Sequence, residues 1–153
     1  YQKISKIKFI GLRFFTIYGE WGRPDMFIYK LFKAFKLKKQ IELNNYGNHE
    51  RDFTYIKDVN IILEKLLFKN NKKHLIFNIC SNNPKNILKI VKKFNIKKNL
   101  NIKFINQHKA DVLKTHGNNA KIKKFLEIKN FSTFDSAFEK TFKWYTKKKL
   151  YKI

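Results

Sequence analysis

Arginine is the residue type in this chain whose scarcity points most directly to chemistry. Of the 35 basic residues, 32 are lysine and three are arginine, namely Arg13, Arg23 and Arg51. A guanidinium presents a planar fork to two oxygens of a phosphate or carboxylate, which a lysine ammonium cannot do. Two of these arginines and three of the five glycines fall between Gly11 and Pro24. We therefore interpret the glycines and arginines of this stretch as residues that its backbone and side-chain geometry requires. The alternative is a tight turn that contains an arginine by chance.

The net charge of +24 is a weaker signal than its size suggests. The 153 residues contain 35 Lys and Arg against 11 Asp and Glu, and 43% of them are apolar, enough for the core of one domain. Lysine, asparagine, isoleucine, phenylalanine and tyrosine dominate, as an A/T-rich coding sequence would produce. A basic surface also binds polyanions by releasing counterions. A basic nucleic-acid-binding module is thus an alternative function, although the lysines are spread along the whole chain.

Several classes of protein are excluded or disfavoured by residue counts. The single cysteine, Cys80, excludes an intrachain disulfide and a site of several thiolates, and the four histidines lack metal-ligand spacing, so we expect no metal. No stretch approaches the roughly 20 apolar residues of a membrane span, and we expect a cytoplasmic protein with no membrane partner. The chain begins with Tyr1, which suggests a piece of a longer protein.

Apolar periodicity predicts alternating strands and helices, and therefore an α/β fold. Asp58 is expected to cap a helix, and a stripe of aromatic residues in the last helix is expected to be core. The predicted strands are 8–17, 40–43, 74–79 and 101–105, with an extended segment at 51–56; the predicted helices are 25–38, 58–68, 86–94, 118–126 and one from 133.

Two motifs together carry a resemblance to a known family. GLRFFTIYGEWGRPDM (11–26) and RDFTYIKDV (51–59) resemble the C-terminal half of extended short-chain dehydrogenase/reductases, and most of all UDP-glucuronate 4-epimerases. Shorter similarities follow in the same order along the chain. These are FNICSNNP (77–84), ADVLKT (110–115) and FKWY (142–145).

The resemblance implies a particular fold and division of the chain. The fold would be the C-terminal part of an extended Rossmann-type fold, with its last sheet strand and a small α/β substrate-binding domain. Residues 1–17 would form a residual Rossmann strand and residues 18–153 the nucleotide-sugar-binding part. The N-terminal half, which binds most of the NAD, would be absent, together with the glycine-rich loop and the Tyr-x-x-x-Lys pair. A match to that pair at Tyr145 and Lys149 is interpreted as chance.

The resemblance also assigns residues to ligands, with no catalytic residue among them. Phe15 would pack against the nicotinamide side of NAD. Thr16 would contact the sugar or its phosphates, Arg51 would bind the UDP diphosphate, and Asp111 would lie near the ribose hydroxyls. Arg23 would border the sugar pocket. From residue type alone, we expect Arg13 to be a buried, paired scaffold residue.

The implied function is nucleotide-sugar binding in an enzyme that converts UDP-glucuronate to UDP-galacturonate through a 4-keto intermediate, with the chain inactive alone. Implied partners are the UDP-sugar and an N-terminal Rossmann half, in the same chain or a separate one, and a homodimer is compatible with the family. Another NAD-dependent nucleotide-sugar epimerase, dehydratase or decarboxylase is the alternative within the family. No specific nucleic acid is implied.

Overall fold

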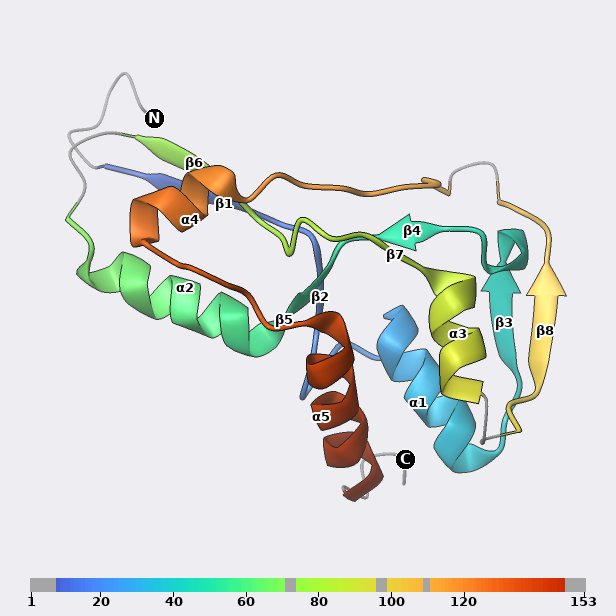
Figure 1. Cartoon of the computed structure of the whole chain (residues 1–153). Coiled ribbons are helices and arrows are strands. Elements are labelled where there is room, and N and C mark those ends of the chain that lie inside the picture. The colour runs from blue at the N-terminus through green and yellow to red at the C-terminus, as the bar shows by residue number, and fades with distance from the viewer. Residues whose placement is uncertain (1–7, 71–73, 96–98, 109–110, 148–153) are drawn as a thin grey trace.

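The segment predicted as one strand over residues 8–17 is two strands that belong to different sheets. The computed structural model describes residues 8–70, 74–95, 99–108 and 111–147, and shows β1 pairing in parallel with β6 while β2 pairs in parallel with β5 (Figure 1). Phe15 lies at the break: its backbone N–H donates to the carbonyl of Ile79, and the next one, of Thr16, donates to the carbonyl of Asp52. The strand-pairing partner therefore changes at Phe15, from β6 to β5.

The remaining elements agree with the predicted order to within a few residues. The elements are β1 (Ile10–Phe14), β2 (Thr16–Tyr18), α1 (Phe27–Leu37), β3 (Ile41–Asn44), the 3₁₀ turn η1 (Asn45–Gly47), β4 (Glu50–Arg51), β5 (Phe53–Tyr55), α2 (Ile56–Phe68), β6 (Leu75–Ile79), β7 (Lys85–Asn86), α3 (Ile87–Asn95), β8 (Ile102–Ile105), α4 (Ala120–Leu126) and α5 (Phe134–Lys147). None of the helices in the described part is long and apolar enough to cross a membrane.

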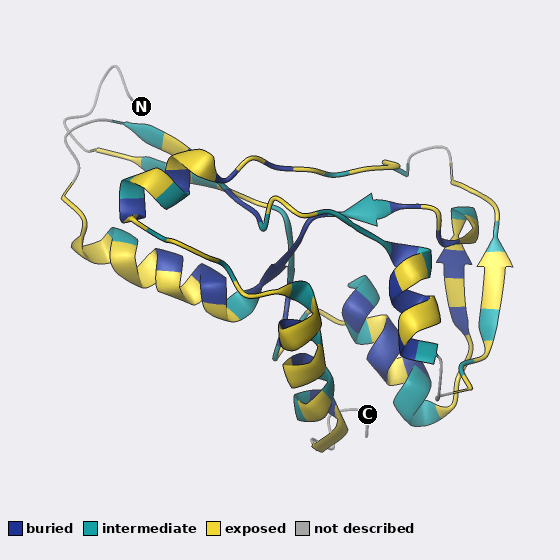
Figure 2. Cartoon of the chain, viewed as in Figure 1, coloured by how far each residue is buried: buried dark blue, intermediate teal, exposed yellow. Residues whose placement is uncertain are grey.

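Two apolar clusters lie at opposite ends of the molecule (Figures 1 and 2). At one end, α2 and α4 cover one face of the β1–β6 pair and bury Val59, Ile62 and Phe77 against Ile122. At the other end, α1, α3 and α5 pack together with β2, β3 and β5 around Phe32, whose ring contacts four aromatic rings. The aromatic stripe of α5 faces this second cluster, as predicted.

Parallel pairing extends well beyond a terminal strand, which corrects the predicted fold class. The β1–β6 pair is separated in sequence by α2, and the β3–β8 pair, also parallel, is separated by α3. Parallel strands joined through helices are the Rossmann-like arrangement, and it lies inside the chain rather than in an absent part. The expected fold, with one residual Rossmann strand followed by a substrate-binding domain, is therefore wrong. A domain boundary after residue 17 stays a prediction.

Two single-residue expectations are also wrong. Arg13 is exposed because it points from the face of β1 opposite α2 and α4, where Ile76 of β6 is also 47% exposed. Asp58 does not cap α2, which begins two residues earlier, after Tyr55. Its carboxylate instead accepts hydrogen bonds from the backbone N–H (3.0 Å) and hydroxyl (2.9 Å) of Ser132, and so ties α2 to the segment before α5.

A buried carboxylate at the centre of the molecule joins three segments that are far apart in sequence. Asp52, with no exposed surface, accepts hydrogen bonds from the backbone N–H groups of Ser81 (2.9 Å), Asn82 (3.1 Å) and Gly117 (3.0 Å), and from the Ser81 hydroxyl (2.7 Å). Its own N–H donates to the Thr115 hydroxyl. Asp52 thus holds the loop after β6 and the segment before α4 against β4 and β5.

Replacing Asp52 with alanine should destabilise the chain more than removing any surface carboxylate. The change leaves the buried N–H of Gly117 and the partly buried N–H groups of Ser81 and Asn82 without an acceptor, so the free energy of unfolding should fall by about 3 kcal/mol or more in a urea titration. The control is Asp135→Ala, because the Asp135 carboxylate is exposed and is paired with the exposed ammonium of Lys93. Equal stability of the two variants would contradict the central role of Asp52.

Candidate functional site

A cleft beside β4 brings together three of the residues assigned from the sequence. Thr16, Arg51 and Asp111 all line it, although they are up to 95 positions apart. Its volume is about 380 Å³, within the range of small-molecule sites. The other lining residues are Asp25, Met26, Phe27, Lys30, Ile41, Glu42, Leu43, Asn44, His49, Phe53 and Ile87.

The backbone that carries Arg51 is fixed from both sides. On one side, β4 pairs antiparallel with β7, so that Arg51 lies opposite Lys85. On the other side, the Glu50 N–H donates to the Leu113 carbonyl and the Thr115 N–H donates to the Glu50 carbonyl. Because both neighbours are strand-like, the position of the Arg51 Cα is set by hydrogen bonds that do not involve its side chain.

One nitrogen of the Arg51 guanidinium is hydrogen-bonded within the described part of the protein, and the other two are not. Its Nη1 donates to the carbonyls of Glu50 (2.9 Å) and Leu113 (3.3 Å). Among the described residues, Nε and Nη2 have no hydrogen-bond partner, so two donor nitrogens remain available to a ligand. Partial burial lowers the pKa of Arg51 from its ordinary value, and the charge of Asp111 acts in the opposite direction. A half-buried cation with two spare donor nitrogens is a suitable partner for a phosphate.

Asp111 enters the cleft from a different segment than Arg51. Its carboxylate accepts a hydrogen bond from the Asn44 side-chain amide at the end of β3 (3.1 Å). Its backbone N–H donates to the His108 carbonyl (2.9 Å). The segment carrying Asp111 runs along one edge of the molecule from β8 to α4, with residues 109–110 outside the described part (Figure 1). The cleft thus depends on this long connection being held in place.

Arg23 is not brought into the cleft. Its side chain is 73% exposed and forms two hydrogen bonds to the Asp25 carboxylate, one of them from Nε at 3.0 Å. This contact holds the pKa of Asp25 below its ordinary value. Only Asp25 lines the cleft, so Arg23 borders the site at most through its partner.

Phe15, the residue assigned to NAD, lies outside the cleft at the carboxyl ends of β1 and β6. A Cβ at residue 117 would lie 2.6 Å from its ring and 2.5 Å from the sulfur of Cys80, so Gly117 is required by close packing. Ligands of open α/β sheets bind at this edge, and a flat apolar ring fits such a wall. The diphosphate of NAD needs a glycine-rich turn into a helix. At Phe15, the described residues therefore offer a wall that fits the ring end of NAD.

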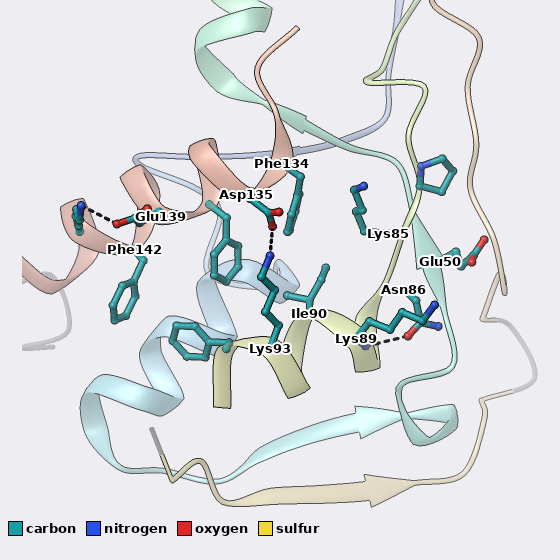
Figure 3. Close-up of a pocket in the computed structure, with 14 residues that line it drawn as sticks. Glu50, Lys85, Asn86, Lys89, Ile90, Lys93, Phe134, Asp135, Glu139 and Phe142 are labelled. Carbon is teal, nitrogen blue, oxygen red and sulfur yellow. Dashed lines mark hydrogen bonds and ion pairs between the residues drawn. The ribbon is translucent and has the colours of Figure 1, made fainter. Parts of the chain in front are cut away.

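A larger groove, of about 770 Å³, lies between α3 and α5 (Figure 3). Its walls are apolar, with Ile90 on α3 and Phe134 and Phe142 on α5. Two lysines at its rim are paired, one with Asp135 across the groove (2.8 Å) and the other with Glu139 along α5 (2.7 Å). None of the assigned residues lines this groove. Its size alone does not make it the nucleotide site.

Two features could not be predicted from residue types alone. His49, one of the four histidines without metal-ligand spacing, is buried at 6% exposure and lines the cleft. A spacing of Tyr-x-x-x-Lys also occurs at Tyr29 and Lys33, in α1. Tyr29 packs edge-on against Tyr145 (5.5 Å between ring centres), Lys33 is exposed, and neither lines the cleft. The other match ends at Lys149, outside the described residues.

The fold and the cleft define a class: a Rossmann-like α/β protein with a cleft lined by charged and apolar side chains. The sequence model described as the NAD dependent epimerase/dehydratase family matches residues 1–80. This chain belongs to that family.

Individual relatives cover nearly the whole chain but only part of their own length. An uncharacterized protein of Methanocaldococcus jannaschii is 39% identical over 97% of this chain and 46% of its own. UDP-glucuronate 4-epimerase of Thermodesulfobacterium geofontis is 32% identical over 94% of this chain and 45% of its own. The crystal structure of UDP-glucuronic acid 4-epimerase from Bacillus cereus with UDP-glucuronic acid and NAD superposes with a TM-score of 0.85 (23% identity, 95% of this chain, 48% of that one). The chain thus spans about half the length of these relatives.

The family match corrects the resemblance drawn from the motifs. The interpretation of the chain as a C-terminal sugar-binding half, from which the NAD-binding half is absent, is wrong. The match to the NAD-dependent family begins at the first residue and continues to residue 80. Within that range, β1 and β6 form the parallel pair of a Rossmann-like sheet. The motifs identified the family, but not how its fold is distributed over this chain.

The thiol of Cys80 should be unreactive in the folded chain. Burial and the charge of Asp52 raise its pKa to about 11, and the side chain has no exposed surface. Its reaction with an aromatic disulfide reagent near pH 7.5 should be slow and should accelerate only as the pH approaches 11. In urea, where the chain is unfolded, the reaction rate should depend on pH as it does for an ordinary thiol, whose pKa is about 8.5. Equal rates with and without urea would show that the packing around Gly117 is wrong.

Proposed function

We propose that the cleft beside β4 binds the UDP-sugar of an NAD-dependent, UDP-glucuronate 4-epimerase-like enzyme. The observation that carries the proposal is that Thr16, Arg51 and Asp111, assigned to one ligand from three separate motifs, line one cleft. Its volume lies in the range of small-molecule sites, and the partly buried Arg51 supplies a cation for a phosphate. Because the chain spans about half the length of its relatives, the complete reaction, UDP-glucuronate to UDP-galacturonate, is part of the proposal.

Each of the three side chains has a role that its surroundings support. The two spare donor nitrogens of Arg51 would bind oxygens of the diphosphate, with the rest of the guanidinium fixed on backbone carbonyls. The Asp111 carboxylate, oriented by Asn44, would accept hydrogen bonds from ribose hydroxyls. Thr16, anchored through its N–H to the Asp52 carbonyl, would contact the sugar or its phosphates. NAD, when bound, supplies the hydride chemistry; these residues bind and orient the substrate.

Two alternatives differ in what supports them. Another nucleotide-sugar epimerase, dehydratase or decarboxylase of the same family would use the same cleft, since a diphosphate and a ribose are common to their substrates. A nucleic-acid-binding module rests only on the net charge of +24. At the α3–α5 groove, Lys93 and Lys143 are paired with carboxylates, which reduces the positive charge that this surface would offer a polyanion.

Arg51→Ala should weaken binding of UDP to the 153-residue chain by about 10- to 150-fold, measured by titration calorimetry. Hydrogen bonds to charged groups contribute roughly 1.5–3 kcal/mol, which corresponds to that range. Arg51→Lys should recover only part of the loss, because the ammonium keeps the charge but lacks the planar fork.

The matched control is Arg13→Ala, which removes an exposed guanidinium on β1 and should leave UDP affinity unchanged. Asp58→Ala, which removes the contact with Ser132, should lower stability while also leaving affinity nearly unchanged. If Arg51→Lys binds UDP as tightly as the parent chain, the bidentate role fails. If Arg13→Ala weakens binding as much as Arg51→Ala, the cleft is not the site.

A further inference from the structure

We propose that His49 is a second phosphate-side ligand of this cleft, neutral when the cleft is empty and protonated when a nucleotide diphosphate binds. The proposal rests on the proposed function and adds a residue to it. It predicts that the protein takes up a proton on binding a UDP-sugar, and that its affinity therefore depends on pH.

The imidazole of His49 is placed by its backbone and is incompletely satisfied. The residue is 6% exposed, and its carbonyl accepts a hydrogen bond from the Ile87 N–H at the start of α3 (2.9 Å). Its Nε2 is buried and has no hydrogen-bond partner among the described residues. Buried polar atoms are nearly always paired, so an unpaired one on a residue that lines a ligand-sized cleft indicates a partner gained when a ligand binds. An exposed, incidental histidine would show neither feature.

The charges around His49 favour a change of protonation on binding. Burial and the nearby Arg51 guanidinium lower the pKa of His49, while the Asp111 carboxylate raises it to a smaller extent. The other charged residues lining the cleft are Asp25 on the loop before α1, Lys30 on α1 and Glu42 on β3. A diphosphate bound by Arg51 would offset the repulsion from that cation and add negative charge next to the imidazole.

The direction of the pH dependence follows from these charges. In the free chain, His49 has a depressed pKa and is neutral near pH 7. In the complex, the diphosphate raises the pKa of His49, so binding is accompanied by proton uptake at pH values between the two pKa values. Affinity therefore increases as the pH falls through that window. A rise of one pKa unit on binding corresponds to about a tenfold gain in affinity at low pH.

UDP-glucuronate is the ligand that tests this most cleanly, because its phosphates and carboxylate are already ionised across the window. Titration calorimetry of the 153-residue chain at about pH 6 and about pH 8 should show tighter binding at the lower pH, by roughly three- to tenfold. Repeating the titration at the lower pH in two buffers of different ionisation enthalpy should reveal the proton taken up. His49→Gln, which keeps a polar side chain, should bind with nearly equal affinity at both pH values.

The matched control is His74→Gln, because His74 stacks on Phe9 at the far end of β1. This variant should keep the pH dependence of the parent. A second measurement needs no variant: the ring signals of His49, followed by NMR, should titrate at higher pH once UDP-glucuronate is added.

The outcomes separate this proposal from the proposed function. Tight binding of UDP-glucuronate with no proton uptake, or an unchanged pH dependence in His49→Gln, would overturn the role of His49 and leave the UDP-sugar site standing. If the His49 ring signals titrate at the same pH with and without saturating UDP-glucuronate, the role of His49 is also overturned while the UDP-sugar site stands. Failure of the parent chain to bind at either pH would overturn both.

Discussion

The Asp52 carboxylate is the interaction on which the arrangement of the cleft depends. It lies between the residue that would bind phosphate, Arg51, and the strand β5, and it accepts hydrogen bonds from the loop after β6 and from Gly117. The segment before α4 that it holds is the one that carries Asp111. Its carbonyl also accepts the hydrogen bond of Thr16. Through its carboxylate and its backbone, Asp52 therefore ties together the segments that carry Thr16, Arg51 and Asp111.

Local chemistry allowed much of the fold to be predicted, and tertiary contacts decided the rest. The limits of α1 follow from apolar spacing, and the helix ends at Lys38, which takes a left-handed conformation (φ 53°). The division of residues 8–17 into two strands could not be predicted, because it arises from different partners on either side of Phe15. Arg13 was misplaced for the same reason: its exposure depends on which face of β1 the helices cover.

The candidate site was predictable only where a residue type is difficult to replace. Arg51 stood out because arginine is rare in a chain with 32 lysines, and Asp111 because a motif placed it. His49 gave no such signal: its burial depends on the antiparallel β4–β7 pair and on the hydrogen bond from Ile87. The rarity of arginine did not reveal that Arg23 pairs with its neighbour Asp25 on the surface, and its position at the border of the sugar pocket stays a prediction. Scarcity of a residue type thus identified candidates but not their environment.

The central claim, that the cleft beside β4 and not the larger α3–α5 groove binds the nucleotide, can be tested by amide chemical shifts. Adding UDP-glucuronate to the isotope-labelled chain should shift the signals of Thr16, Asn44, Arg51 and Asp111. The signals of Ile90, Phe138 and Phe142, which line the groove, should remain in place. Shifts confined to the groove residues, with the four cleft residues unchanged, would contradict the account.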